Sequence, residues 1–193
     1  MKIDFTRGAW NTDDITYAYT YRFSGTPEFL QRDDCVENRP DDTGTFGCDW
    51  ENISMLSRKA YSAGTRIETR CAFFDLGAPL ITIADRMYDE NGAQKYGDYL
   101  EVVLYKNGIN VWRMWMDDDK TVTWKKMLGV EFPVSEGDIH TLAVTVTADG
   151  LKIEADEHHI FWHCTDLYDT FHLGIDACEG LNRFYSLEIT ELQ

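Results

Sequence analysis

The sequence predicts an all-β fold in which two antiparallel sheets pack face to face as a sandwich. About a dozen short segments alternate apolar with polar residues, and Gly- or Asp-containing turns separate them at regular spacing. No segment shows the apolar period of an amphipathic helix. The chain has 193 residues, of which 44% are hydrophobic, so it can bury a large core. Because no linker, repeat or low-complexity tract interrupts the pattern, we expect a single domain over residues 1–193.

The predicted strands follow one another with one long interruption. Residues 27–49 form a polar connection with one helical turn at Pro27–Arg32, and long connections of this kind are often functional. A shorter polar loop is expected at Asp89–Asp98. The predicted strands are Ile15–Phe23, Ile53–Ser57, Thr65–Phe74, Leu80–Met87, Tyr99–Tyr105, Ile109–Met116, Thr121–Leu128, Ile139–Thr147, Leu151–Ala155, His158–Cys164, Phe171–Ala177 and Phe184–Glu191.

Residues 99–128 are expected to form a three-stranded meander. Its first turn is predicted at Asn107-Gly108, because Asn-Gly between two alternating segments is a strong hairpin signal. With a two-residue turn there, Val103 lies opposite Trp112. Arg113 and Trp115 then share a face of the sheet that Trp112 does not share, because side chains alternate along a strand.

Composition excludes two classes of partner. The chain has 18 Lys and Arg against 34 Asp and Glu, which gives a net charge of −16. A surface of this charge repels nucleic-acid phosphates and anionic membranes, so neither is expected as a partner. No stretch approaches the roughly 18 apolar residues of a membrane span. The sequence predicts no particular oligomeric state.

The cysteines and the first residues favour a reducing compartment. Their number is odd and no C-x-x-C pair occurs, so we expect all five thiols to be free. MKIDFTRGAW contains no apolar run of a signal peptide. We therefore expect a cytoplasmic protein, or a secreted one if a leader has been removed. The five cysteines are Cys35, Cys48, Cys71, Cys164 and Cys178.

The last third of the chain resembles a known superfamily. IHTLAVTVTADGLKIEADEHHIFW looks like the paired strands around a D-G turn in concanavalin-A-like sandwiches such as laminin-G-type modules. FHLGIDACEGLNRFYSLEIT resembles their terminal strand pair. The resemblance covers roughly Ile53 to the C-terminus. It implies a two-sheet jelly roll of the concanavalin-A-like lectin and glucanase type, with a carbohydrate bound on the concave sheet or at the rim loops.

The resemblance leaves binding and catalysis as alternatives. The retaining glucanases of the superfamily carry a strand motif of the form E-I-D-x-x-E, which this chain lacks; the nearest string, Asp98 to Glu101, is missing the first carboxylate. A carbohydrate-binding, lectin-like protein is therefore the first hypothesis. A glycoside hydrolase or polysaccharide lyase is the second, with Glu101 and Asp85 as catalytic carboxylates. A protein-interaction domain is the third.

The candidate ligand-binding residues fall into two groups. Aromatic rings stack on sugar rings, and Arg and carboxylates hydrogen-bond hydroxyl groups, so we expect a polar groove on the concave sheet. One group lies on the meander, where Glu101 accompanies the aromatic and Arg side chains. The other lies in the terminal loop and at the end of another strand. The predicted ligand-binding residues are Tyr99, Trp112, Arg113, Trp115, Arg86, Asp176, Glu179 and Arg183.

No metal or cofactor is predicted, with one exception. His159 and His163 share a strand face but lie about 13 Å apart, too far to bind one zinc ion. Related sandwiches often carry a structural calcium, as the resemblance implies, and three acidic runs supply oxygen ligands for it. These runs are Asp33-Asp34, Asp41-Asp42 and Asp117-Asp118-Asp119.

Overall fold

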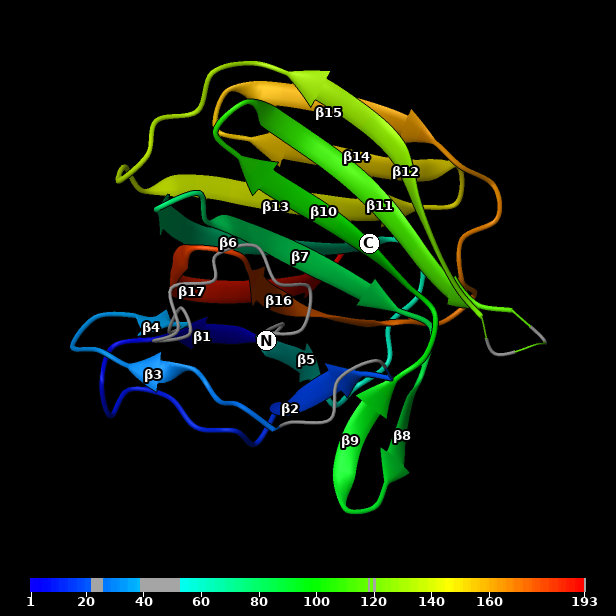
Figure 1. Cartoon of the computed structure of the whole chain (residues 1–193), viewed down its shortest axis with the longest axis horizontal. Coiled ribbons are helices and arrows are strands. Elements are labelled where there is room, and N and C mark those ends of the chain that lie inside the picture. Colours follow the sequence, from blue (N-terminus) through cyan, green and yellow to red (C-terminus); the bar gives the residue numbers. More distant parts are fainter. Residues whose placement is uncertain (22–25, 39–52, 118, 120, 193) are drawn as a thin grey trace.

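The protein is a two-sheet β-sandwich (Figure 1). No helix occurs in the part of the chain described by the computed structural model, so none there could span a membrane. The expected helical turn at Pro27–Arg32 is wrong, because Leu30 and Gln31 form a short strand. The described residues are 1–21, 26–38, 53–117, 119 and 121–192.

The first sheet, here called sheet A, has the strand order β15-β14-β13-β6-β17-β4-β3, and β1 also pairs with β17. The central pair β6 and β17 joins segments more than a hundred residues apart. Its strands are β1 (Lys2–Asp4), β3 (Leu30–Gln31), β4 (Val36–Glu37), β6 (Thr65–Phe74), β13 (His140–Thr147), β14 (Gly150–Ala155), β15 (His158–His163) and β17 (Leu181–Glu191).

The second sheet, sheet B, has the order β12-β11-β10-β7-β16-β5-β2-β9-β8. All of its pairings are antiparallel except β2 with β9, so the sheet is mixed where the sequence predicts a purely antiparallel one. Its strands are β2 (Ile15–Thr20), β5 (Ile53–Ser57), β7 (Ala78–Ala84), β8 (Met87–Glu90), β9 (Ala93–Tyr96), β10 (Tyr99–Tyr105), β11 (Gly108–Met116), β12 (Val122–Glu131) and β16 (His172–Cys178).

Alternation along each strand decides what lies between the sheets. On β10, Leu100, Val102 and Leu104 join the main core cluster, and every second residue between them points away from it. This is the period of two that a sheet with one face on a core imposes. The outer face of sheet B, the side away from the sandwich core, therefore receives Tyr99, Glu101, Val103 and Tyr105.

Two local expectations differ from the structure. The predicted polar loop at Asp89–Asp98 is largely a hairpin, β8 with β9, turned by Asn91 and Gly92 at positive φ. The predicted strand Leu80–Met87 ends at Ala84, and Met87 begins the next strand. Both differences arise at short polar segments, where pairing with a neighbouring strand decides the conformation.

The first meander turn is displaced from the prediction. Lys106 and Asn107 form the turn, and Gly108 already pairs with Tyr105. Gly108 has a φ of 124° and the position of its missing Cβ is 2.1 Å from the Val130 carbonyl oxygen, so glycine is required there for close strand contact. Glu101, rather than Val103, therefore lies opposite Trp112. The slip is two residues, an even number, so the faces predicted for these side chains are retained.

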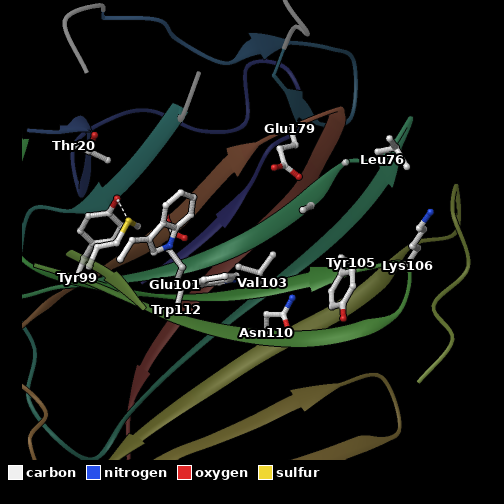
Figure 2. A pocket seen from close by; sticks show the side chains of 14 residues that line it. Thr20, Leu76, Tyr99, Glu101, Val103, Tyr105, Lys106, Asn110, Trp112 and Glu179 are labelled. Carbon is white, nitrogen blue, oxygen red and sulfur yellow. Dashed lines mark hydrogen bonds between the residues drawn. The ribbon is translucent and has the colours of Figure 1, made fainter. Parts of the chain in front are cut away.

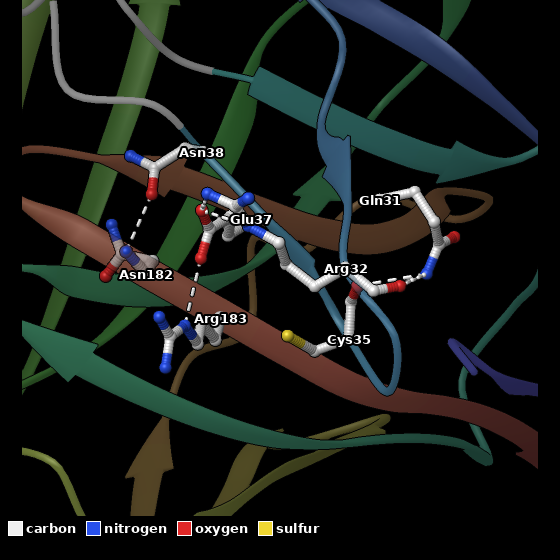
Figure 3. Close-up of polar contacts among 7 residues, drawn as sticks. All are labelled: Gln31, Arg32, Cys35, Glu37, Asn38, Asn182 and Arg183. Carbon is white, nitrogen blue, oxygen red and sulfur yellow. Dashed lines mark hydrogen bonds and ion pairs between the residues drawn. The ribbon is translucent and has the colours of Figure 1, made fainter. Parts of the chain in front are cut away.

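A buried carboxylate fixes β4 against β17 (Figure 3). The Glu37 side chain is 4% exposed and accepts hydrogen bonds from Arg32 Nε at 2.6 Å and Arg183 Nε at 2.9 Å. These two guanidinium groups hold the pKa of Glu37 below its ordinary value although burial opposes them. Arg183 thus serves in a structural ion-pair cluster of sheet A, and its guanidinium also lies over the Phe74 ring.

The described cysteines agree with the expectation of free thiols. Cys35, Cys71 and Cys164 are buried and unpaired, and burial raises the pKa of each. Cys48 lies outside the described residues, as does the side chain of Cys178.

Candidate functional site

The site is built on three neighbouring strands of sheet B. Alternation places Glu101 and Trp112, which are cross-strand partners, on the outer face of the sheet. Val103 and Asn110 form the next outward pair. Apolar, aromatic and hydrogen-bonding side chains therefore share one surface above β10 and β11.

This surface lines a pocket of about 430 Å³ (Figure 2). One wall comes from β11 and β12, and the opposite wall comes from the turns that precede β7 and β17. The floor is formed by the outward residues of β10. The lining residues are Thr20, Leu76, Gly77, Ala78, Tyr99, Glu101, Val103, Tyr105, Lys106, Asn110, Trp112, Met114, Trp124 and Glu179.

Two tryptophans form the aromatic wall. The Trp112 and Trp124 rings lie 5.3 Å apart between centroids with an interplanar angle of 54°. Trp124 is 45% exposed and Trp112 is half-buried, so both rings can contact a bound molecule. The Lys126 ammonium lies 5.9 Å from the Trp112 ring centroid, which places a cation beside the pair.

A β-bulge on β12 decides which side chains of this strand face the pocket. The register of β11 with β12 shifts between Val111 and Trp112, which leaves Met127 as an extra residue on β12. Met127 and Leu128 both pack against the main core although they are adjacent. The bulge therefore reverses the alternation, so that Trp124 and Lys126 lie on the pocket side while the following residues still reach the core.

The floor of the pocket is polar but buried. Glu101 is only 3% exposed. Beside it, Tyr99 donates a hydrogen bond to Met114 Sδ at 3.1 Å and packs edge-on against Tyr96, with ring centroids 4.9 Å apart. Burial raises the pKa of both tyrosines, and the nearby carboxylates raise it further, so both phenols stay protonated at neutral pH.

Asp176 lies on the same face of sheet B, on β16. It is fully buried, and its Oδ2 accepts hydrogen bonds from Ser54 Oγ at 2.7 Å and from the Tyr96 hydroxyl at 3.3 Å. Its Oδ1 and the buried Thr82 hydroxyl have no hydrogen-bond partner among the described residues. Loss of hydration outweighs these hydrogen bonds and raises the pKa of Asp176 to about 6.

Two predicted ligand-binding residues of the meander lie elsewhere. Arg113 is the cross-strand partner of Leu100, so it is on the face opposite Glu101, where it pairs with Asp166 and lies over the Tyr168 ring. Trp115 shares that opposite face and donates to Asp117 Oδ1 at 2.9 Å. The predicted groove that joins Arg113 to Glu101 is therefore wrong, because adjacent strand positions alternate between faces.

Of the remaining predicted residues, some line the pocket and others lie outside it. Asp85 follows β7 at the rim and pairs with the exposed Arg86, and alternation from Thr82, the cross-strand partner of Glu101, places it on the opposite face. Glu101 and Asp85 thus do not form a carboxylate pair. Tyr99, Trp112 and Glu179 do line the pocket, whereas Arg183 does not.

Comparison with known proteins identifies the fold. No model of a protein family matches the chain, and no curated protein matches its sequence. Solved structures do match it over nearly its whole length. One is a carbohydrate-binding module from Bacillus subtilis, with 12% identity, a TM-score of 0.58 and coverage of 97% of this chain and 94% of the other.

Two further matches belong to enzymes. A β-porphyranase from the human gut bacterium Bacteroides plebeius shares 11% identity with a TM-score of 0.62, over 100% of this chain and 91% of its own. A structure described with endo-acting O-glycanases of the human gut microbiota that initiate mucin breakdown shares 12% identity with a TM-score of 0.64, over 100% and 99%. The chain has the concanavalin-A-like jelly-roll fold. At these identities the likeness concerns the fold alone.

Several residues that line the pocket of this jelly roll were not predicted from the sequence. Tyr105, Lys106 and Asn110 lie in or near the hairpin turn, and only the packing of the turns before β7 and β17 above them shows that they line a pocket. Trp124 follows from the sequence as an aromatic residue of the meander, but its face depends on the bulge. An extra residue on an edge strand leaves no clear mark in the sequence pattern.

The acidic runs form no evident metal centre in the described chain. No group of three or more described His, Cys, Asp or Glu side chains could hold a metal ion. Asp117 instead accepts hydrogen bonds from Trp115 and Thr123. Asp41, Asp42 and Asp118 lie outside the described residues.

Proposed function

We propose that this protein binds an oligosaccharide or polysaccharide in the pocket on the outer face of sheet B. The observation that carries the proposal is the Trp112–Trp124 pair, two partly exposed indole rings at the side of a concave, partly polar pocket. Indole faces stack on the apolar C–H faces of sugars, and such large apolar groups are otherwise buried in a core.

The polar lining supports the same ligand class. Asn110 can donate and accept, Glu101 accepts, and the phenol of Tyr105 can do both, which suits the mixed hydrogen bonding of sugar hydroxyls. Ligand sites commonly combine a mainly apolar lining with a few such groups. The carbohydrate-binding module and the glycan-cleaving enzymes that share the fold support this class of ligand.

Glycan hydrolysis is the second candidate function, because Glu101 and Asp176 occupy the same face of the sheet. They lie two strands and two positions apart, which corresponds to roughly 12 Å between Cα atoms. Hydrolysis requires the two carboxyl groups themselves to lie about 5–5.5 Å apart in retaining enzymes or about 6.5–9.5 Å apart in inverting ones. The burial of Asp176 away from the pocket lining favours binding over catalysis.

The test is a glycan-binding assay with tryptophan variants. Trp112→Ala should reduce affinity at least about tenfold, since loss of stacking costs on the order of 1.4 kcal/mol or more. Trp115→Ala is the matched control, because Trp115 lies on the same strand but on the opposite face. Equal loss in both variants, with unchanged circular dichroism, would contradict the proposed site.

The same samples separate binding from hydrolysis. If the protein only binds, no reducing ends appear when bound glycans are incubated with the wild type. If turnover is seen and Glu101→Gln abolishes it without loss of binding, the second candidate replaces the first.

A further inference from the structure

The charge of the pocket rim differs from that of the rest of the molecule. The chain carries 34 acidic side chains against 18 basic ones, so basic groups are the minority. Lys106 lines the pocket and Lys126 lies over the Trp112 ring, and neither forms an ion pair with any described residue. The acidic rim residue is Glu179, while Glu101 lies buried in the floor.

Lys126 has a defined place in this rim. Its side chain packs beside Gly129 and Asn110, where a glycine leaves space for it. The Lys126 ammonium group therefore lies at the aromatic wall, next to the position that a stacked sugar would take. Figure 2 shows its neighbours Trp112 and Asn110, together with Lys106. The bulge at Met127 directs Lys126 to this face, as it does Trp124.

Protection of the sheet edge accounts for only part of this pattern. β12 is the last strand of sheet B, and lysines on edge strands discourage pairing with other chains. That role fits Lys125, which by alternation lies on the opposite face beside Arg113. It does not explain Lys106, which lies in a turn, nor the placement of Lys126 against an aromatic ring.

We infer that the glycan bound in this pocket is anionic, and that a sulfate or carboxylate substituent of the sugar stacked on Trp112 pairs with Lys126, with Lys106 serving a second charge farther along. The inference rests on the proposed function. The negative surface elsewhere repels such a polymer, so the two lysines would also restrict it to one orientation on the molecule.

The test uses pairs of glycans that differ only in charge. Native and chemically desulfated carrageenan form one pair, polygalacturonate and its methyl ester form another, and laminarin is a neutral third probe. We expect one charged member to bind at least about tenfold more tightly than its neutralised partner, since a charged hydrogen bond in a partly shielded site has this effect. Which pair responds distinguishes sulfate from carboxylate.

Lysine variants give the second arm of the test. Lys126→Gln should weaken binding of the charged glycan about tenfold and remove the preference over its neutral partner. Lys125→Gln, on the adjacent residue and the opposite face, and Lys152→Gln, on sheet A, are the matched controls and should change the affinity less than twofold.

The outcomes separate the inference from the proposed function. Binding of neutral and charged partners with equal affinity, weakened by Trp112→Ala but not by Lys126→Gln, would overturn the inference and leave the proposed function standing. No binding to any of the five glycans would count against both. Equal loss in Lys125→Gln and Lys126→Gln would indicate a general charge effect and also overturn the inference.

Discussion

Asp176 is a carboxylic acid whose buried setting changes its ordinary chemistry. A carboxylate in the middle of a strand is disfavoured, and this one is fully buried with two hydroxyl donors on one oxygen. The donors offset only part of the lost hydration, so the folded protein holds a proton at Asp176 more strongly than the unfolded chain does. Asp176 thereby lowers the stability of the fold at neutral pH.

Replacement of Asp176 by Asn should therefore stabilise the protein at pH 7. The folded pKa of about 6 lies above the unfolded value of about 3.9. The contribution of Asp176 to the free energy of unfolding is thus fully present below pH 4 and is lost as pH rises towards 6, by up to about 3 kcal/mol. Urea titrations at pH 4 and pH 7 should show the wild type losing stability relative to Asp176→Asn over that interval.

The difference between the two proteins is the quantity to compare, because other carboxylates act in the opposite direction. Glu37 has a lowered pKa, so its stabilising ion pairs are lost as pH falls. This loss is common to wild type and variant and cancels. A difference that does not change between pH 4 and pH 7 would show that Asp176 has an ordinary pKa.

At the scale of the element, β12 decides the composition of the pocket. A regular strand that buried Leu128 and Val130 would also direct Lys126 towards the core and Lys125 outward. The bulge lets one strand serve two requirements, core packing at one end and an aromatic wall at the other. Bulges next to functional sites commonly change the direction of side chains in this way.

Deletion of Met127 should retain the wall, because it removes only the extra residue of the bulge. Lys126 then directly precedes Leu128, so regular alternation keeps Lys126 and Trp124 on the pocket side and Leu128 in the core. Deletion of Lys125 should instead turn Trp124 away from Trp112, and we expect glycan affinity to fall at least as far as in Trp124→Ala. The loss of the 5.3 Å ring pair can be followed as a loss of near-ultraviolet circular dichroism. Equal affinity in the two deletion variants would show that alternation along β12 does not position the wall.

At the scale of the whole molecule, charge is the dominant feature. The net charge is −16, so the folded state carries considerable self-repulsion. Salt screens this repulsion, and the screening length falls from about 30 Å at 0.01 M to about 8 Å at 0.15 M. Salt should therefore stabilise the folded state.

Stability should rise with moderate salt. Between 0.01 M and 0.15 M NaCl we expect a gain of about 1 kcal/mol, which corresponds to roughly 2–4 °C in Tm for a chain of this size. Differential scanning calorimetry measures this, with sorbitol at matched osmolality as the control. A Tm that decreases with NaCl would indicate that attractive ion pairs, rather than repulsion, dominate the surface.

The sequence alone determines the fold class and most strands. Thr65–Phe74, Ile53–Ser57 and Tyr99–Tyr105 are predicted with the bounds that the structure has, because alternation and turn residues are local properties of the chain. The sequence also determines that Trp112 and Arg113 cannot share a face. Because the register places Glu101 opposite Trp112, the same alternation excludes a groove that contains both Arg113 and Glu101.

Tertiary structure decided the membership of the site. The position of the turn decides whether Glu101 or Val103 lies opposite Trp112. The face of Trp124 depends on a bulge that is defined only by the pairing of β12 with β11. Glu179 reaches the pocket from a turn nearly eighty residues farther along the chain, which no local pattern predicts. Side-chain direction within a strand is a local property, but which strands become neighbours, and in what register, is settled by packing across the whole sandwich.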